Sequence, residues 1–246
     1  MLRSVKSIYG YKIAATDGTI GKAHDVYFDD ENWAIRYLVV DTGTLLTGHK
    51  VLIFPIATAQ PDWKRQVIPV GLSKDHIENS PPIDKDKPVS KQHEIDLHTY
   101  FNLAPYWTAG MGGPWGTAVP PMPEGFVPPP ESDDESGDPH LRSTRELTGY
   151  HLQALGGEIG HVEDFIVDDE SWHVRYMVIK TKNWLPGKKV ILPPAWIERF
   201  SWKEKKVFCE LSRDEIKNAP EYDPEQPINR DYEIQYYDYY GRPAYF

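Results

Sequence analysis

Apolar and polar residues alternate over short runs in the first part of the chain, and turn residues separate these runs. Asp17-Gly18 is a residue pair typical of tight hairpin turns, because glycine adopts a positive φ without strain. Val26 and Phe28 alternate with polar neighbours, which indicates a strand with one buried face. Residues 34–40 are apolar on both faces apart from one arginine, which is typical of a central strand. The pattern therefore predicts β structure with a hairpin at its start.

The same pattern continues in shorter segments. Residues 50–55 form an apolar run that ends in Pro55, where a ladder hydrogen bond is lost. Another strand is expected at residues 67–70, and Ser73 is a suitable N-cap for one helical turn. Five or six short strands leave many unpaired edges, and closure into a small β-barrel is the arrangement that protects them.

The second half of the chain repeats the first without a gap when the sequence is shifted by 139 positions. Agreement of this length indicates two copies of one fold, in residues 4–107 and 143–246. The matched pairs include Gly21 with Gly160, Asp29-Asp30-Glu31 with Asp168-Asp169-Glu170, Trp33 with Trp172, Arg36-Tyr37 with Arg175-Tyr176, Ser73 with Ser212, and Glu94-Ile95 with Glu233-Ile234.

The duplication sets the expected domain organisation. The residues between the two copies are rich in Pro, Gly and acidic side chains. Such a segment buries too little apolar surface to offset its ordering entropy, so we expect it to be a mobile linker. Each tail is expected to form a short helix and to dock on a barrel, its own or that of the other copy, because it carries many aromatic side chains. The expected ranges are 4–84 for repeat 1, 85–107 for its tail, 108–142 for the linker, 143–223 for repeat 2 and 224–246 for its tail.

Charge and composition narrow the possible partners. A net charge of −10 disfavours nucleic acid, whose sequence-independent binding requires Lys and Arg. Cys209 is the one cysteine, so no intrachain disulfide can form, and a reducing compartment is expected. Neither a signal peptide nor a run of about 20 apolar residues is present, so we expect a cytoplasmic chain without a membrane span.

Candidate chemistry is sparse, and we assign no catalytic, cofactor-binding or metal-binding residue. None of the nine histidines falls on a histidine of the other copy. The acidic triplet beginning at Asp29, and its second copy, lack the alternating ligands of a calcium loop, so we interpret both as solvated hairpin turns. Arg36 needs a partner within its apolar strand, and Asp25 is the candidate. Arg175 and Asp164 are the equivalent pair in the second copy.

The residues also resemble a known family. Gly21, Asp25 and the runs at residues 35–43 and 50–55 are similar to the PRC-barrel pattern, and residues 184–194 of the second copy are the closer match. The resemblance covers about 80 residues of each copy. It implies a small β-barrel, also found in the photosynthetic reaction-centre H subunit and in a ribosome maturation factor. It implies no family-wide catalytic residue.

We therefore expect a non-catalytic protein-interaction or assembly module. The partner is unidentified, and it is either another protein, a second copy of this chain or the other repeat. The candidate contact surfaces are the aromatic tails together with Trp107, Trp115, Trp184 and Trp196. Two alternatives remain open: a small-ligand binder or enzyme with a pocket at a barrel mouth or between the repeats, and, by analogy with the family, a ribosome-associated factor.

Overall fold

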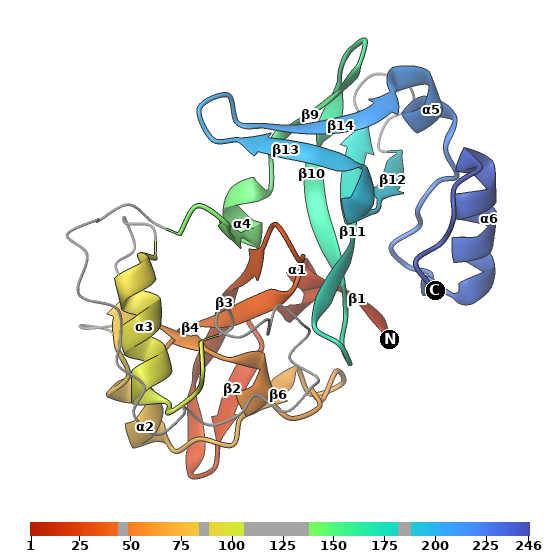
Figure 1. The fold of residues 1–246 in the computed structure, drawn as a ribbon. Helices are drawn as coiled ribbons and strands as arrows, with labels where there is room; N and C mark the ends of the chain where they lie inside the picture. Colours follow the sequence, from red (N-terminus) through yellow and green to blue (C-terminus); the bar gives the residue numbers. More distant parts are fainter. Residues whose placement is uncertain (44–48, 84–88, 106–137, 182–187) are drawn as a thin grey trace. The chain divides into compact units, whose positions relative to one another are not determined.

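The computed structural model describes residues 1–43, 49–83, 89–105, 138–181 and 188–246. The protein is mainly β, with two separate sheets of seven strands each (Figure 1). The chain divides into two compact units. Unit 1 comprises Met1–Val5, Glu146–Asp168 and Val174–Phe246, and unit 2 comprises Lys6–Arg145 and Asp169–His173.

Unit 2 contains the sheet of the first repeat. Its strands follow the order β6-β2-β3-β4-β5-β7, and β8 pairs with β3 beside this path. The strands are β2 (Lys12–Ala15), β3 (Gly18–Asp29), β4 (Ile35–Asp41), β5 (Lys50–Ile53), β6 (Val67–Pro69), β7 (Pro82–Ile83) and β8 (Leu141–Ser143). The helices are α1 (Val5–Ile8), whose first residue belongs to unit 1, the short η1 (Pro55–Ala57), α2 (Lys74–Glu78) and α3 (Lys91–Tyr100).

Unit 1 contains the sheet of the second repeat. Its strands follow the order β12-β11-β10-β9-β14-β13, and β1 pairs with β10 beside this path. The strands are β1 (Leu2–Ser4), β9 (His151–Leu155), β10 (Gly157–Asp168), β11 (His173–Thr181), β12 (Lys189–Leu192), β13 (Ile197–Ser201) and β14 (Lys206–Ser212). The helices are α4 (Thr144–Leu147), which begins in unit 2, the short η2 (Pro194–Trp196), α5 (Arg213–Asn218) and α6 (Arg230–Tyr240).

The local predictions are largely confirmed. Asp17-Gly18 forms the turn between β2 and β3, and Gly18 has a φ of +136°. Ser73 and Ser212 cap α2 and α5 by accepting hydrogen bonds from backbone amides three residues on. Both tails contain the expected helix, α3 and α6.

The expected closed barrel is not formed by the described strands. The pairing in unit 2 runs along an open path from β6 to β7. These end strands contain only three and two residues, and each pairs with one neighbour, β6 with β2 and β7 with β5. Short edge strands protect a sheet from unwanted pairing without closure.

The strand that begins each repeat starts two residues before the expected bounds, at Leu2 and Leu141, and lies in the sheet that contains the other repeat, which the internal duplication did not indicate. In unit 1, β1 pairs with β10, with Leu2 opposite Asp168. In unit 2, β8 pairs with β3, with Ser143 opposite Tyr27. Both exchanged strands have the sequence Leu-Arg-Ser.

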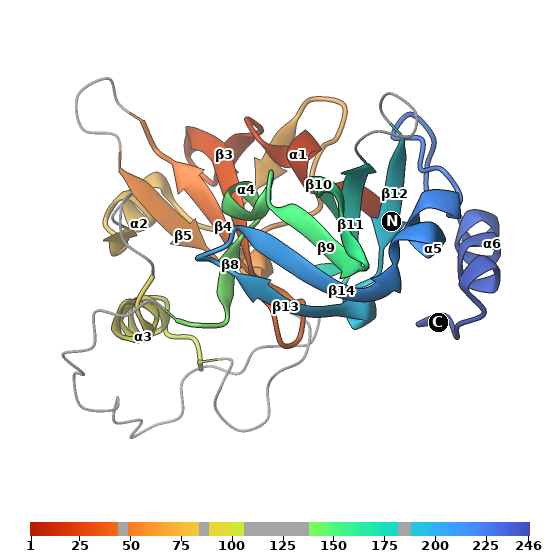
Figure 2. The same ribbon diagram turned by 90° about the horizontal axis from the view of Figure 1, so that it is seen from above.

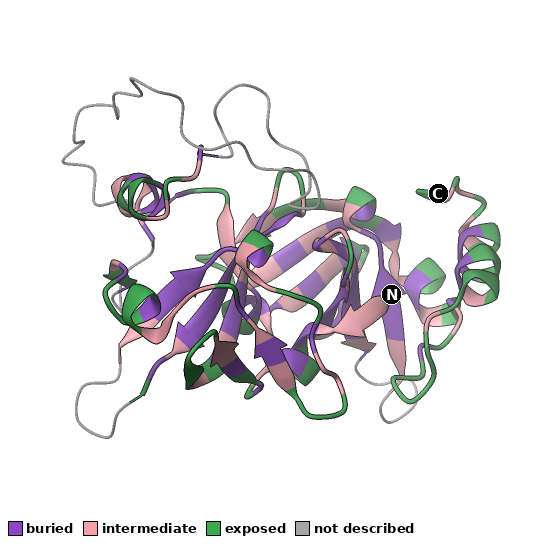
Figure 3. Ribbon diagram, turned by 90° about the horizontal axis from the view of Figure 1, so that it is seen from below, coloured by how far each residue is buried: buried purple, intermediate pink, exposed green. Residues whose placement is uncertain are grey.

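Each tail helix packs on the sheet of its own repeat (Figure 2). In unit 2, Leu97 of α3 joins the apolar cluster formed by Tyr37, Leu52 and Phe54. In unit 1, Tyr236 of α6 stacks on Trp196, with ring centroids 5.8 Å apart. Figure 3 shows that burial is concentrated in the strands and on one side of these helices. Tail docking therefore occurs within each repeat.

Candidate functional site

A buried tyrosine–glutamate pair joins tail and sheet at the same position in both repeats. The hydroxyl of Tyr37 on β4 donates to Oε2 of Glu94 on α3 at 2.6 Å. The hydroxyl of Tyr176 on β11 donates to Oε1 of Glu233 on α6 at 2.7 Å. All four residues are nearly inaccessible to solvent. Because a buried polar group is costly without a partner, each pair selects one docking position for its helix.

In unit 2 this pair belongs to a larger buried polar cluster. Burial raises the pKa of Glu94 to about 8. Lys91 Nζ lies 2.8 Å from Oδ2 of Asp138, and although burial opposes it, hydrogen bonds from Glu94 and Lys91 lower the pKa of Asp138 to about 2. Burial also lowers the pKa of His98 to about 4. The cluster fastens α3 to the sheet, because its members on α3 bond to groups outside that helix.

In unit 1 the tail leaves an apolar surface uncovered. Ile234, Tyr245 and Phe246 are 44%, 45% and 50% exposed, and we call them the C-terminal aromatic face. The guanidinium of Arg230 lies 3.5 Å from the ring centroid of Phe246, and that of Arg175 lies 4.6 Å from the ring centroid of Tyr245. Aromatic side chains beside arginine are the residues most enriched in protein contact surfaces.

The predicted tryptophan surface is not formed by Trp196. This residue is 5% exposed and packs against Tyr236, Tyr237 and Tyr240. Its role is therefore internal, because η2 turns the indole under α6. Trp107, Trp115 and Trp184 lie outside the described residues.

The acidic triplet of the first repeat holds basic side chains, and its interpretation as a solvated turn was wrong for two of its three members. Asp29 is buried and accepts from Arg36 at 2.8 Å. Burial alone would raise the pKa of Asp29, but Arg36 and two backbone amides outweigh it and lower that pKa. Asp30 accepts from Nε of Arg142 at 2.5 Å and from His140 at 3.0 Å, which raises the pKa of His140. Glu31 remains largely exposed.

The predicted partners of the two strand arginines were also wrong. Arg36 pairs with Asp29, and Arg175 lies 3.6 Å from Asp168. Asp25 instead binds the exchanged segment, accepting from Ser143 Oγ at 2.5 Å, from Thr144 Oγ1 at 3.0 Å and from the Arg145 amide at 3.0 Å.

The second repeat uses its equivalent carboxylate in the same way. Asp164 accepts from Ser4 Oγ at 2.5 Å. These two carboxylates therefore fix the exchanged strands. The signal that could have identified them is their matching position in both repeats.

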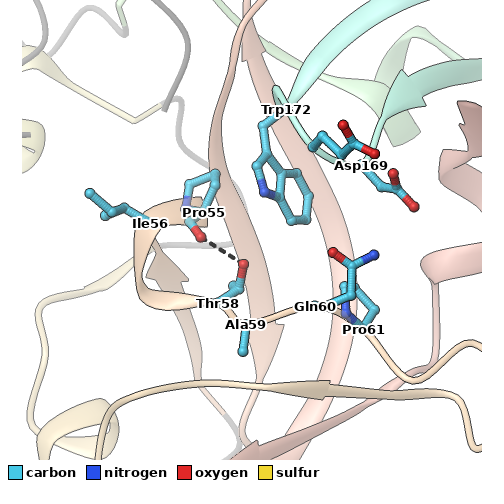
Figure 4. A pocket seen from close by; sticks show the side chains of 9 residues that line it. Pro55, Ile56, Thr58, Ala59, Gln60, Pro61, Asp169 and Trp172 are labelled. Carbon is cyan, nitrogen blue, oxygen red and sulfur yellow. Dashed lines mark hydrogen bonds between the residues drawn. The ribbon is translucent and has the colours of Figure 1, made fainter. Parts of the chain in front are cut away.

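A cavity of about 380 Å³ lies in unit 2 beside Trp172 (Figure 4). The segment from Pro55 to Pro61 forms one wall, and the indole of Trp172 with Asp169 forms the other. Glu170 also lines the cavity. In the first repeat the equivalent residues, Asp30 and Glu31, contact basic side chains of the chain itself. By analogy we interpret Asp169 and Glu170 as structural residues, and we assign no ligand to this cavity.

In the part of the chain that the structure describes, no group of three or more His, Cys, Asp or Glu is arranged to hold a metal ion. Cys209 is buried, and burial raises the pKa of its thiol to about 11, which makes the reactive thiolate scarce at neutral pH. No described helix combines the length and apolar character needed to cross a membrane.

The fold and these contacts define a mainly β protein of two duplicated sheets, held by exchanged strands and docked tails. The PRC-barrel domain matches residues 153–216, which lie within the second repeat. Among curated proteins, none matches this chain.

Proposed function

We propose that this chain is a non-catalytic interaction module built from two PRC-barrel-type repeats, and that the C-terminal aromatic face binds a second protein chain. The PRC-barrel match to residues 153–216 supports this reading of repeat 2, and the internal duplication extends it to repeat 1.

One observation carries the proposal. Ile95 and Ile234 occupy the same position in the two tail helices, yet Ile95 is 5% exposed and Ile234 is 44% exposed. A position that is buried in one copy and bare in the other is not required by the fold to be apolar. Burying Ile234, Tyr245 and Phe246 against a partner would remove apolar area from water, and this contributes about 25 cal/mol per Å² to the free energy of binding.

The test compares the wild type with the double variant Ile234→Ser/Phe246→Ser. Light scattering with size-exclusion chromatography measures self-association, and affinity capture with quantitative mass spectrometry measures other partners. We expect the double variant to bind its partner about tenfold or more weakly than the wild type, because central apolar contacts are removed. Circular dichroism checks that the variant is folded.

The matched control is Leu155→Ser, which removes an apolar side chain that is 57% exposed at the β9–β10 hairpin. It should leave association unchanged. A monomeric wild type that captures the same proteins as the double variant would contradict the proposal.

A further inference from the structure

Unit 2 contains a second cavity whose charge is opposite to that of the whole chain. Its volume is about 610 Å³, within the range of small-molecule sites. Lys12, Lys22, His24 and Arg145 contribute basic side chains to its lining, and Asp41 contributes one carboxylate. The chain as a whole has a net charge of −10.

The lysines of this cavity face each other, and neither forms an ion pair with a carboxylate in the described part of the chain. Lys12 on β2 and Lys22 on β3 are directly opposed in the antiparallel pair. Like charges in this arrangement destabilise a sheet. Among the described residues, no carboxylate lies within ion-pair distance of either lysine. Asp41, opposite Lys22 on β4, adds one negative charge to the lining and accepts through Oδ1 from the amide of Gly43 at 3.0 Å, so Lys12, Lys22 and Arg145 still leave the lining with an excess of positive charge.

The other basic groups are held in place around the lysines. Lys50 Nζ lies 2.7 Å from Nε2 of His24, so the ammonium donates to a neutral imidazole. Burial, Lys50 and Arg145 together lower the pKa of His24. Arg145 donates from Nε to the His24 carbonyl at 3.0 Å, and its guanidinium lies 4.6 Å from the Tyr9 ring centroid. Among the described residues, these contacts engage Nε and the face of the guanidinium, and its terminal nitrogens make no hydrogen bond that would compete with a ligand.

The second repeat shows that the fold does not require this charge. The equivalents of Lys12, Lys22 and His24 are His151, His161 and Glu163. There, Glu163 lies 3.3 Å from Lys189 and 3.8 Å from His161. Glu158 lies 2.9 Å from His151. The same place in the fold is thus neutralised by carboxylates in unit 1 and left basic in unit 2.

We propose that the cavity lined by Lys12, Lys22, His24 and Arg145 binds a small polyanion that carries phosphate groups. Ammonium groups and a guanidinium fork are the side chains that bind phosphate oxygens best. A bound anion also removes the repulsion between the opposed lysines. Arg145 belongs to the exchanged segment, so the site is complete only when that segment is in place.

Isothermal titration calorimetry on the full chain tests the site, with tripolyphosphate as the probe at about 50 mM ionic strength, where surface charges are weakly screened. We expect one site per chain. Lys12→Gln/Lys22→Gln should weaken binding about tenfold or more. His24→Glu introduces the residue that the other repeat carries at this position, and it should weaken binding similarly while the fold is retained.

Lys203→Gln is the matched control, because it removes one exposed lysine from the β13–β14 turn, and binding should remain within about twofold of wild type. No saturable binding by the wild type, or equal affinities for the wild type and the double variant, would overturn the proposal. Tighter binding of a single-stranded DNA oligomer through the same lysines would overturn the assignment to a small molecule.

Discussion

At the residue scale, the position of one carboxylate decides the environment of Arg36. The register of β3 and β4 places Ile35 opposite Phe28, beside Asp29. Asp25 lies opposite Val39, three residues from Arg36. One register shift, between Tyr27 and Phe28, lies between these two positions, and bulges of this kind cannot be located from apolar alternation alone. The need for a partner was predictable from the sequence, whereas its identity was not.

Glu94 makes stability depend on pH. Its pKa is about 8 in the folded protein and near 4.5 when exposed, so the folded state retains a proton that the unfolded state releases. The stabilisation of the folded state by this bound proton is complete below pH 4.5 and is lost as the pH rises to about 8. His98, with a folded pKa of about 4 against 6.5, acts in the opposite direction, but only below pH 6.5.

We therefore expect the free energy of unfolding to fall between pH 6.5 and 8, with Glu94 contributing up to about 1.4 kcal/mol per pH unit. Glu94→Gln should reduce this slope, whereas Asp96→Asn, an exposed change on the same helix, should retain it. Urea titrations at several pH values measure the effect. Identical slopes for Glu94→Gln and the wild type would exclude this role.

Gly21 and Gly160 are predicted to be intolerant of a side chain. A Cβ would lie 2.3 Å from the Asp41 carbonyl oxygen at Gly21, and 2.4 Å from that of Lys180 at Gly160. Gly21→Ala should cost about 1–3 kcal/mol by overpacking. Gly71→Ala is the control, because its Cβ would meet its nearest atom at 3.8 Å. Thermal unfolding followed by circular dichroism compares them, and equal midpoints would contradict the prediction.

At the element scale, the strands, turns and tail helices follow from local patterns, but strand partners do not. Asp17-Gly18 and the N-caps Ser73 and Ser212 act within a few residues of their own position, so they were predictable. The pairing of β1 with β10 joins residues more than 160 positions apart in the sequence. No local periodicity carries that information.

Deleting residues 1–4 should therefore affect the second repeat rather than the first. We expect amide hydrogen exchange to accelerate about tenfold at Ile166–Asp168 of β10, where the paired strand is lost. The equivalent segment of β3, which pairs with β8, should keep its protection. Hydrogen-exchange mass spectrometry measures both, and a loss confined to the first repeat would disprove the exchange.

At the scale of the whole molecule, the exchange makes the two repeats depend on each other. A chain cut within residues 108–137 leaves each half without the strand that pairs in its sheet. Because both exchanged strands read Leu-Arg-Ser, β1 carries the side chains that Asp25 and Asp30 require from β8.

The isolated fragment 1–107 should therefore form a dimer in which each copy supplies β1 to the other, as in domain swapping. Adding fragment 138–246 should convert this dimer into a 1:1 complex. Light scattering with size-exclusion chromatography distinguishes the species. Asp25→Ala should weaken the dimer by removing the acceptor of the strand serine, Ser143 in the full chain and Ser4 in the dimer. A folded monomer of fragment 1–107 would contradict the prediction.

The sequence by itself determined that the chain contains two copies of one β-rich fold, because the repeat has a fixed spacing. It also determined where the turns and tail helices lie, because neighbouring residues encode these features. Only the tertiary structure decided that the sheets stay open, that the tails dock on their own repeat, and that Ile234 is bare where Ile95 is buried. It also decided which sheet receives each first strand. Residues 2–4 and 141–143 have the same sequence, so local preferences are equal, and only contacts made far along the chain distinguish their places.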